Sequence, residues 1–253
     1  MLLKFLNRLE KTLSIFILIF FIISLTATSV SAGSATKAVV SISFDDNDMY
    51  QVGILDGKGV QGTIAYVTRD IYPSDLTSMH KEEKKGWEIA SHTVNHTADS
   101  EIEFSNSIKY LVGKGFTVNG FVVPCGGPLT NTQVGWASKY YKWSRNCVEY
   151  TSNPSSTAYY NYPPINKYQL IGVTPNGHNL SDLKKLVDTA NKKNYWLIFA
   201  FHRDEITNKD LKSLIDYTKS KNIQILPINK AINVYSKYGT TSKFSSNAIA
   251  YNE

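Results

Sequence analysis

The chain has 253 residues, of which 42% are hydrophobic and 19% are charged, and its formal net charge is +6. This composition is ordinary for a globular protein and excludes disorder as the general state of the chain. The lysines are scattered and no arginine-rich stretch occurs, so the charge gives little support for a nucleic-acid-binding protein.

The first 32 residues have the pattern of an export signal. Lys4, Arg8 and Lys11 precede an apolar run over 15–25, and the sequence Val-Ser-Ala at 30–32 resembles a cleavage site. The run is shorter than the ~20 residues that span a bilayer, which favours a cleaved signal peptide over an uncleaved anchor. Either alternative predicts a protein outside the cytoplasmic membrane, secreted or associated with the cell envelope.

Patterns typical of strands and of helices alternate along the rest of the chain. Apolar and β-branched runs predict strands at 38–44, 62–67, 87–90, 120–124, 141–145, 168–173, 196–201 and 223–226. Apolar periodicity and capping residues predict helices at 75–85, 99–114, 132–139, 180–191 and 208–219. Residues 150–168 are rich in Tyr, Pro, Ser and Asn and indicate a long ordered loop.

This alternation predicts an α/β fold around a parallel sheet. About seven strands favour closure into a single distorted (β/α) barrel, and a smaller doubly wound sheet is the alternative. We expect a signal segment at 1–32, one domain at 33–237 and a polar tail at 238–253.

Titratable side chains follow three of the predicted strands at their carboxyl ends. Asp45 and Asp46 follow the first strand, His92 and His96 follow the third, and His202 follows the seventh. Each feature is common by itself, but in a parallel barrel these strand ends share one rim, where active sites form. A carboxylate with two imidazoles can hold a metal ion and leave a position open for water. The sequence therefore predicts a metal-centred site, with neighbouring groups available as acid and base.

The motifs resemble those of the polysaccharide deacetylases, carbohydrate esterase family four, which includes chitooligosaccharide deacetylases. The resemblance extends over residues 38–230 and rests on four segments: Phe44-Asp45-Asp46, Gly86 to His96, Pro124-Cys125-Gly126 and Ile198 to His202. It implies a distorted (β/α) barrel and the metal-dependent removal of N- or O-acetyl groups from sugars. The expected partner is an acetylated polysaccharide or oligosaccharide, with no nucleic acid and with membrane contact only through the N-terminal segment.

The resemblance also implies roles for single residues. Asp45 corresponds to the general base and His202 to the general acid. Asp46, His92 and His96 correspond to the ligands of a metal ion, usually zinc, with another divalent transition metal as the alternative.

The segment Pro124-Cys125-Gly126 corresponds to the turn whose backbone N–H helps to bind the oxyanion. Cys125 would then contribute its amide and not its thiol. An exported protein permits a disulfide between Cys125 and Cys147, but the sequence does not establish one.

The chain departs from the family pattern at several positions. Asn47 replaces a glycine that often follows the two aspartates, and asparagine tolerates a positive φ better than most residues. Val122 occupies the position of an arginine that pairs with the base, and Arg145, at the end of a nearby predicted strand, is the candidate substitute. Ala200 in the fifth motif indicates a roomier pocket for the acetyl methyl group.

Other features leave alternatives open. The fourth motif has no clear match, and Trp143 and Asp204 are the candidates for it. Aromatic residues between 150 and 162 form either a stacking rim for sugars or a loop packed on itself. The remaining histidines, at 80 and 178, are expected to be structural or exposed.

The sequence thus predicts an exported, metal-dependent hydrolase that removes acetyl groups from N-acetylated glycans. One alternative is a catalytically weak or idle family member that keeps metal and glycan binding. Another is an O-acetyl esterase acting on polysaccharide.

Overall fold

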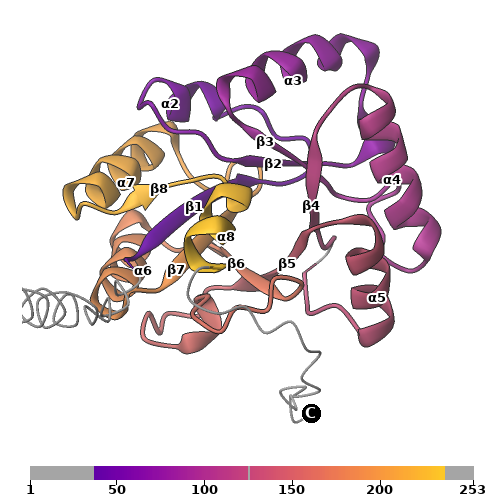
Figure 1. Cartoon of the computed structure of the whole chain (residues 1–253). Coiled ribbons are helices and arrows are strands. Elements are labelled where there is room, and N and C mark those ends of the chain that lie inside the picture. Colours follow the sequence, from indigo (N-terminus) through magenta and orange to yellow (C-terminus); the bar gives the residue numbers. More distant parts are fainter. Residues whose placement is uncertain (1–36, 125, 237–253) are drawn as a thin grey trace, which may run out of the picture. The chain divides into compact units, whose positions relative to one another are not determined.

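The computed structural model describes residues 37–124 and 126–236. The predicted signal segment, the whole predicted tail and Cys125 therefore lie outside the described residues. Within the described ranges, eight strands form one parallel sheet in the order β2-β3-β4-β5-β6-β7-β1-β8. An additional pairing of β1 with β2 closes strands β1 to β7 into a barrel (Figure 1). The prediction of a single distorted (β/α) barrel is confirmed.

The predicted helices and strands are present, with shifted ends. The strands are β1 Val39–Phe44, β2 Thr63–Tyr66, β3 Glu88–Ser91, β4 Val118–Val122, β5 Trp143–Glu149, β6 Leu170–Thr174, β7 Trp196–Phe201 and β8 Gln224–Ile225. The helices are α2 Val52–Asp56, α3 Pro73–Lys85, α4 Glu101–Gly113, α5 Asn131–Tyr140, α6 Leu180–Lys193, α7 Asn208–Ser220 and α8 Ile228–Ser236. Single 3₁₀ turns occur at η1 Thr68–Asp70 and η2 Thr157–Tyr159.

Strand β1 is the centre of the sheet. One edge pairs with β7 along the whole strand, from Val39 opposite Trp196 to Phe44 opposite Phe201. The other edge pairs with β8 at its amino end and with β2 at its carboxyl end. The two carboxylates that follow Phe44 are therefore held at the rim where β7 and β2 also end.

Helix α8, which the sequence analysis missed, closes the opposite end of the barrel (Figure 1). Its residues Ile228, Ala231 and Tyr235 are buried with the side chains of the barrel interior, such as Trp143 and Trp196. The spacing of these three residues is that of an apolar helix face. Helix α8 thus covers the amino ends of the strands, opposite the rim that carries the two aspartates.

Local signals set the helix ends largely as expected. The side chain of Asn179 accepts the N–H groups of the first turn of α6, and α3 ends at Gly86 with a φ of 100°. Asp75 was predicted to cap α3, but the chain enters the helix earlier, at Tyr72. The Asp75 carboxylate instead accepts the N–H of Tyr72 at 2.8 Å. No helix among the described residues is long and apolar enough to span a membrane.

Candidate metal centre and active site

The three predicted metal ligands meet at the carboxyl end of the barrel. Asp46 Oδ1 lies 3.3 Å from His92 Nε2 and 3.1 Å from His96 Nε2. One possible ligand atom from each of the three side chains lies within 4.8 Å of the others. His92 is buried, whereas Asp46 is exposed, so the group opens to solvent on one side. One carboxylate and two imidazoles are a donor set that fits zinc or a similar transition metal with positions left open.

The ring of His92 is held in the orientation that a ligand needs. Its Nδ1 lies 2.9 Å from the carbonyl oxygen of Val122, and because a carbonyl only accepts, this nitrogen carries the proton. Nε2, which faces Asp46, is then the ring nitrogen that would bind a cation held between the two side chains. The backbone at Val122 thus contributes to the site although its side chain lies in the barrel interior.

A carboxylate from α4 fixes the loop between the two histidines. Glu103 accepts the N–H groups of Val94 at 2.9 Å and Asn95 at 2.8 Å, and the side-chain amide of Asn95 at 2.6 Å. These bonds hold a tight turn in which His96 has a φ of 62°. Sequence reasoning missed Glu103, because nothing in the helix pattern distinguishes it from a surface carboxylate.

Asn47 holds the loop that carries the two aspartates. Its φ is 62°, which confirms the positive φ expected where asparagine replaces glycine. The side chain accepts the N–H of Val67 at 2.6 Å and donates to the Val67 carbonyl at 3.2 Å. This loop is thereby fixed to the chain that follows β2, which orients Asp46.

Asp45 is 1% exposed and forms a buried ion pair with Arg145, which is 0% exposed. The same guanidinium donates to Ser43 Oγ at 2.9 Å. The candidate substitute for the missing arginine therefore does reach the predicted base. Its predicted position at a strand end was wrong, because β5 continues to Glu149.

The strand pairing explains how this substitution works. Val122 on β4 and Arg145 on β5 are register partners, so they lie at the same height in the barrel wall. A guanidinium carried by β5 at this height, in place of one carried by β4, still reaches the carboxylate of Asp45. Burial would lower the pKa of Arg145, but the negative charge of Asp45 outweighs it and raises that pKa. The arginine is therefore charged at every physiological pH.

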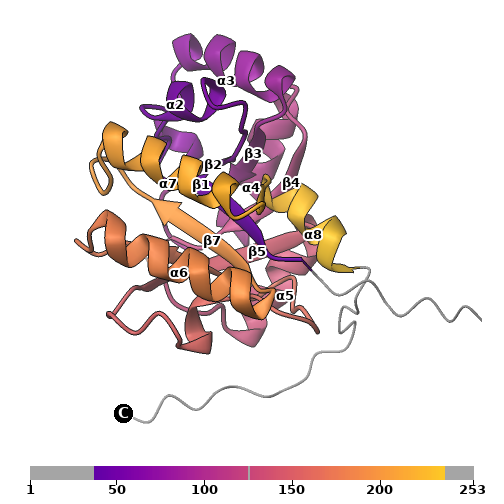
Figure 2. The same cartoon turned by 90° about the vertical axis from the view of Figure 1, so that its left-hand side faces the viewer.

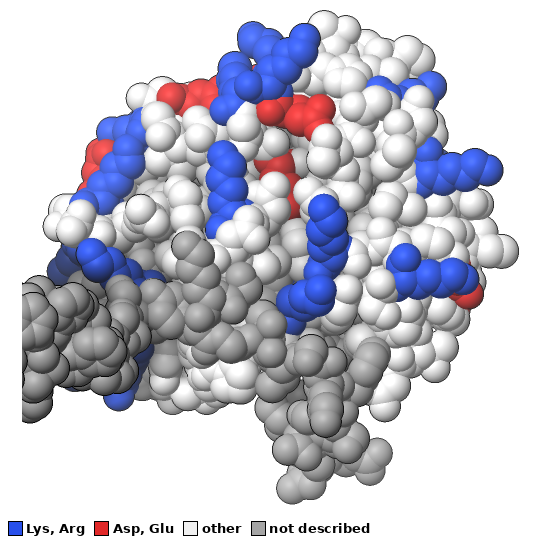
Figure 3. All heavy atoms as spheres, viewed as in Figure 1, with Lys and Arg blue, Asp and Glu red and all other residues white. Residues whose placement is uncertain are grey.

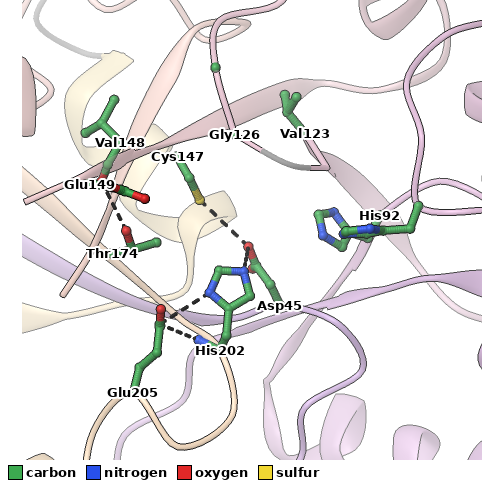
Figure 4. Close-up of a pocket in the computed structure, with 12 residues that line it drawn as sticks. Asp45, His92, Val123, Gly126, Cys147, Val148, Glu149, Thr174, His202 and Glu205 are labelled. Carbon is green, nitrogen blue, oxygen red and sulfur yellow. Dashed lines mark hydrogen bonds and ion pairs between the residues drawn. The ribbon is translucent and has the colours of Figure 1, made fainter. Parts of the chain in front are cut away.

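His202 is supported by a residue that sequence reasoning missed. Glu205 Oε2 lies 3.3 Å from His202 Nδ1 and accepts the His202 backbone N–H at 2.7 Å (Figure 4). The other ring nitrogen lies 3.9 Å from Asp45 and 4.0 Å from Asp46. The bond to Glu205 raises the pKa of His202. An acid three residues after the histidine was the signal available in the sequence.

The two candidates for the fourth motif do not support His202. Asp204 is exposed and has a φ of 67°. Trp143 donates its ring N–H to Glu88 at 3.1 Å, at the end of the barrel that α8 closes. Both assignments were wrong because they rested on residue type, whereas the partner of a ring nitrogen is decided by loop geometry.

Burial and close neighbours shift the pKa values of two further groups of the site, Asp46 and Cys147. The hydrogen bond from His92 lowers the pKa of Asp46, and the imidazole charges add to this effect. Burial raises the pKa of the Cys147 thiol to about 12, so the thiol stays neutral. Cys147 forms no disulfide with a described residue, and the other cysteine, Cys125, lies outside the described ranges. The Sγ of Cys147 lies 3.8 Å from Asp45 Oδ2.

Most of these groups line one cavity of about 380 Å³, a size in the range of small-ligand sites. Asp46 lines a neighbouring cavity that His202 also lines. The lining of the first cavity includes Asp45, His92, His96, His202 and Gly126, all predicted for the site, and Cys147, Glu149, Thr174 and Glu205, which were not (Figure 4). Pro124 is buried at the end of β4, beside this lining. The assignment of the oxyanion N–H to Cys125 falls on a residue outside the described ranges.

The tyrosine-rich loop packs on itself. Tyr150, Tyr159 and Tyr160 are 1%, 4% and 1% exposed, whereas Tyr162 is 43% exposed. The rings of Tyr150 and Tyr159 meet edge to face at 5.3 Å. The alternative of a sugar-stacking rim is therefore not supported for the three buried rings.

Comparison with known proteins identifies the fold. No family model and no curated protein matches the sequence. A family 4 acetyl xylan esterase from Clostridium thermocellum, solved with a cobalt ion, matches with a TM-score of 0.55 at 16% identity, over 78% of this chain and 91% of that chain. The catalytic domain of a peptidoglycan N-acetylglucosamine deacetylase from Eubacterium rectale gives 0.53 at 15% identity, over 80% and 93%.

A pseudoenzyme of family CE4 from Bacillus anthracis also matches, with a TM-score of 0.50 at 14% identity, over 77% of this chain and 65% of that chain. A mutant of a CE4 pseudoenzyme with restored enzymatic activity matches equally well in TM-score, 0.50. Active and inactive proteins thus share this architecture. The described chain has the fold of the carbohydrate esterase family four deacetylases, and the resemblance seen in its motifs is confirmed at the level of the fold.

Proposed function

We propose that this protein is an exported, metal-dependent hydrolase that removes acetyl groups from N-acetylated glycans. One observation carries the proposal: the Asp46, His92 and His96 cluster lies beside His202, and His92, His96, His202 and Asp45 line one cavity. A zinc ion or another divalent transition metal held by the cluster would lower the pKa of a bound water and polarise the acetyl carbonyl.

Asp45 takes the proton of the attacking water in this scheme. A general base needs a fixed carboxylate near the attacking water, and the buried Arg145 guanidinium holds a positive charge against the carboxylate of Asp45. Arg145 and Ser43 also limit the orientations of the carboxylate. Arg145 is therefore a positioning residue that acts through Asp45.

His202 gives its proton to the leaving nitrogen of the sugar. The hydrogen bond to Glu205 favours the protonated imidazole, as an acid requires. Addition of water to the acetamide and cleavage of its C–N bond then yield acetate and a free amine. The oxyanion donor in this scheme is the backbone N–H of Cys125, between Pro124 and Gly126.

Two rivals from the sequence analysis stay open to test. The match to an acetyl xylan esterase supports an O-acetyl substrate, for which the same residues would serve. The match to a pseudoenzyme supports a binding role without turnover. The ion pair between Arg145 and Asp45 argues against a binding role without turnover. Arg145 supplies the positive charge beside Asp45 that the arginine replaced by Val122 would have supplied.

The test is acetate release by the purified chain from residue 33 to residue 253. N-acetylated chitin oligosaccharides and acetylated xylan are assayed in parallel, first with a chelator and then with zinc restored. The proposal predicts release from chitin oligosaccharides that chelator abolishes and zinc restores, and no release by a His92→Ala variant. Release from xylan alone would favour the esterase, and zinc binding without release from either substrate would favour the binding role.

A further inference from the structure

Lysines gather at the end of the barrel opposite the candidate active site. Helices α3, α6 and α7 end there and carry lysine in their last turns, and other lysines precede strands at the same end. We call this set the basic face: Lys37, Lys58, Lys84, Lys85, Lys114, Lys142, Lys167, Lys192, Lys193, Lys219, Lys221 and Lys230. Figure 3 shows this end of the molecule, with blue side chains spread over it and few red ones.

Few carboxylates compensate these charges. Lys58 pairs with Asp216, Lys85 with Asp56 and Glu82, and Lys221 with Asp188. The other lysines of the basic face form no ion pair with another described residue. Most of them are exposed. A positive potential therefore extends over this end of the barrel.

Helix dipoles explain only part of the pattern. A lysine at the end of α3 or α6 complements the negative end of its helix and needs no other reason. Lys37 precedes strand β1 with no described helix ending before it, whereas Lys142 directly follows the C-cap of α5, where the dipole favours a cation. Lys230 lies in the first turn of α8, where the dipole disfavours a cation. The basic face therefore includes lysines whose positions no helix dipole explains.

The opposite rim is acidic. The two aspartates after β1 and Glu205 lie there, and acidic residues occupy the first turns of α3, α4, α6 and α7. The charges of the molecule are thus separated along the barrel axis. An anionic surface would orient the domain with the basic face toward it and the cavity away from it.

The chain also enters the domain at the basic face. Lys37 directly precedes β1, and its carbonyl accepts the hydroxyl hydrogen of Tyr235 at 3.1 Å. Figure 2 shows β1 beginning and α8 ending at the same side of the barrel. The preceding sequence contains the apolar run at 15–25, so a chain that kept this segment in a bilayer would join the domain at the basic face.

We propose that the basic face binds the anionic headgroup surface of a lipid bilayer and holds the active-site cavity facing outward. The charge of the face and the entry of the chain point to the same surface. Lysines near such a surface each strengthen binding about fivefold, and the effect fades beyond a Debye length. The inference is independent of the reaction proposed for the cavity.

Vesicle co-sedimentation of residues 33–253, which contain the complete described barrel and its core, tests the proposal without the apolar run. Vesicles of phosphatidylcholine alone are compared with a mixture of phosphatidylcholine and phosphatidylglycerol, at low and at high salt. The test variant carries Lys84→Gln, Lys142→Gln and Lys230→Gln. The matched control removes the same charge from first-half helix positions, with Lys185→Gln, Lys209→Gln and Lys212→Gln.

We expect binding to the anionic vesicles only, weakened by salt, and weakened about a hundredfold in the test variant but little in the control. Equal losses in the two variants, equal binding to neutral vesicles, or no binding at low salt would overturn the proposal. Binding to soluble inorganic polyphosphate but not to vesicles would overturn it in favour of an anionic polymer. Far-UV circular dichroism and the urea unfolding midpoint serve as the fold control, since neither depends on the reaction proposed for the cavity.

Discussion

Replacement of Arg145 by methionine removes one half of a fully buried ion pair. The carboxylate of Asp45 would keep three neighbours: Ser43 Oγ at 3.4 Å, Cys147 Sγ at 3.8 Å and His202 Nε2 at 3.9 Å. Only His202 can carry a positive charge, and it is half-buried, so it replaces the buried guanidinium in part. Breaking a buried pair from one side costs about 3–5 kcal/mol, because the remaining charge is buried without compensation. We expect the free energy of unfolding, measured in urea, to fall by about this amount.

The same change should reduce acetate release at least about a hundredfold, which corresponds to about 3 kcal/mol in the barrier. Lys139→Met is the control for loss of a cation, since the Lys139–Glu101 pair is at the surface, where solvent screens it, and its loss should change stability little. Adding Asp45→Asn to the Arg145→Met variant should recover stability, because no buried charge is then left. A stable and active Arg145→Met variant would refute the role of this pair.

Three further predictions follow from single contacts. Burial raises the pKa of Glu88 to about 7, so the folded state binds this proton more tightly than the unfolded chain. The free energy of unfolding should therefore fall by about 3 kcal/mol as pH rises from below 4.5 through 7, and urea unfolding of Glu88→Gln should lack this fall. Glu205→Gln should lower kcat and move the alkaline limb of the pH–rate profile to lower pH, because His202 loses the partner that raises its pKa; an unchanged profile would argue against this contact. Glu103→Gln should weaken zinc binding about tenfold to a hundredfold in calorimetry, since the loop with His96 loses its anchor; unchanged affinity would show that the loop is held otherwise.

The sequence predicted features whose cause is local. Strand β7 was placed correctly because an unbroken apolar run in a parallel sheet is buried on both faces. Asp45, Asp46 and the three histidines were found because they interrupt apolar strands at their ends. The turn at Asn47 was anticipated from the residue type alone.

Features that depend on neighbouring strands or on loop paths were not predictable in this way. Glu205 reaches His202 because the backbone turns at Asp204, which has a positive φ. The sequence analysis had offered Asp204, one residue earlier, as the acidic partner of His202. The sequence offered Arg145 as the candidate partner of Asp45. Only the structure shows that Arg145 lies beside Val122 in the sheet and that its guanidinium reaches Asp45. Helix α8 follows a strand of only two residues, so nothing marked its start, although its apolar spacing was visible.

The most direct test of the catalytic account compares the zinc-loaded wild-type chain with its Asp45→Asn variant. Zinc content and acetate release from chitin oligosaccharides are measured on the same samples. The account predicts one zinc ion per chain in both, with release lost only in the variant, because Asp46, His92 and His96 hold the ion while Asp45 takes the proton. Release by Asp45→Asn at the wild-type rate would contradict it.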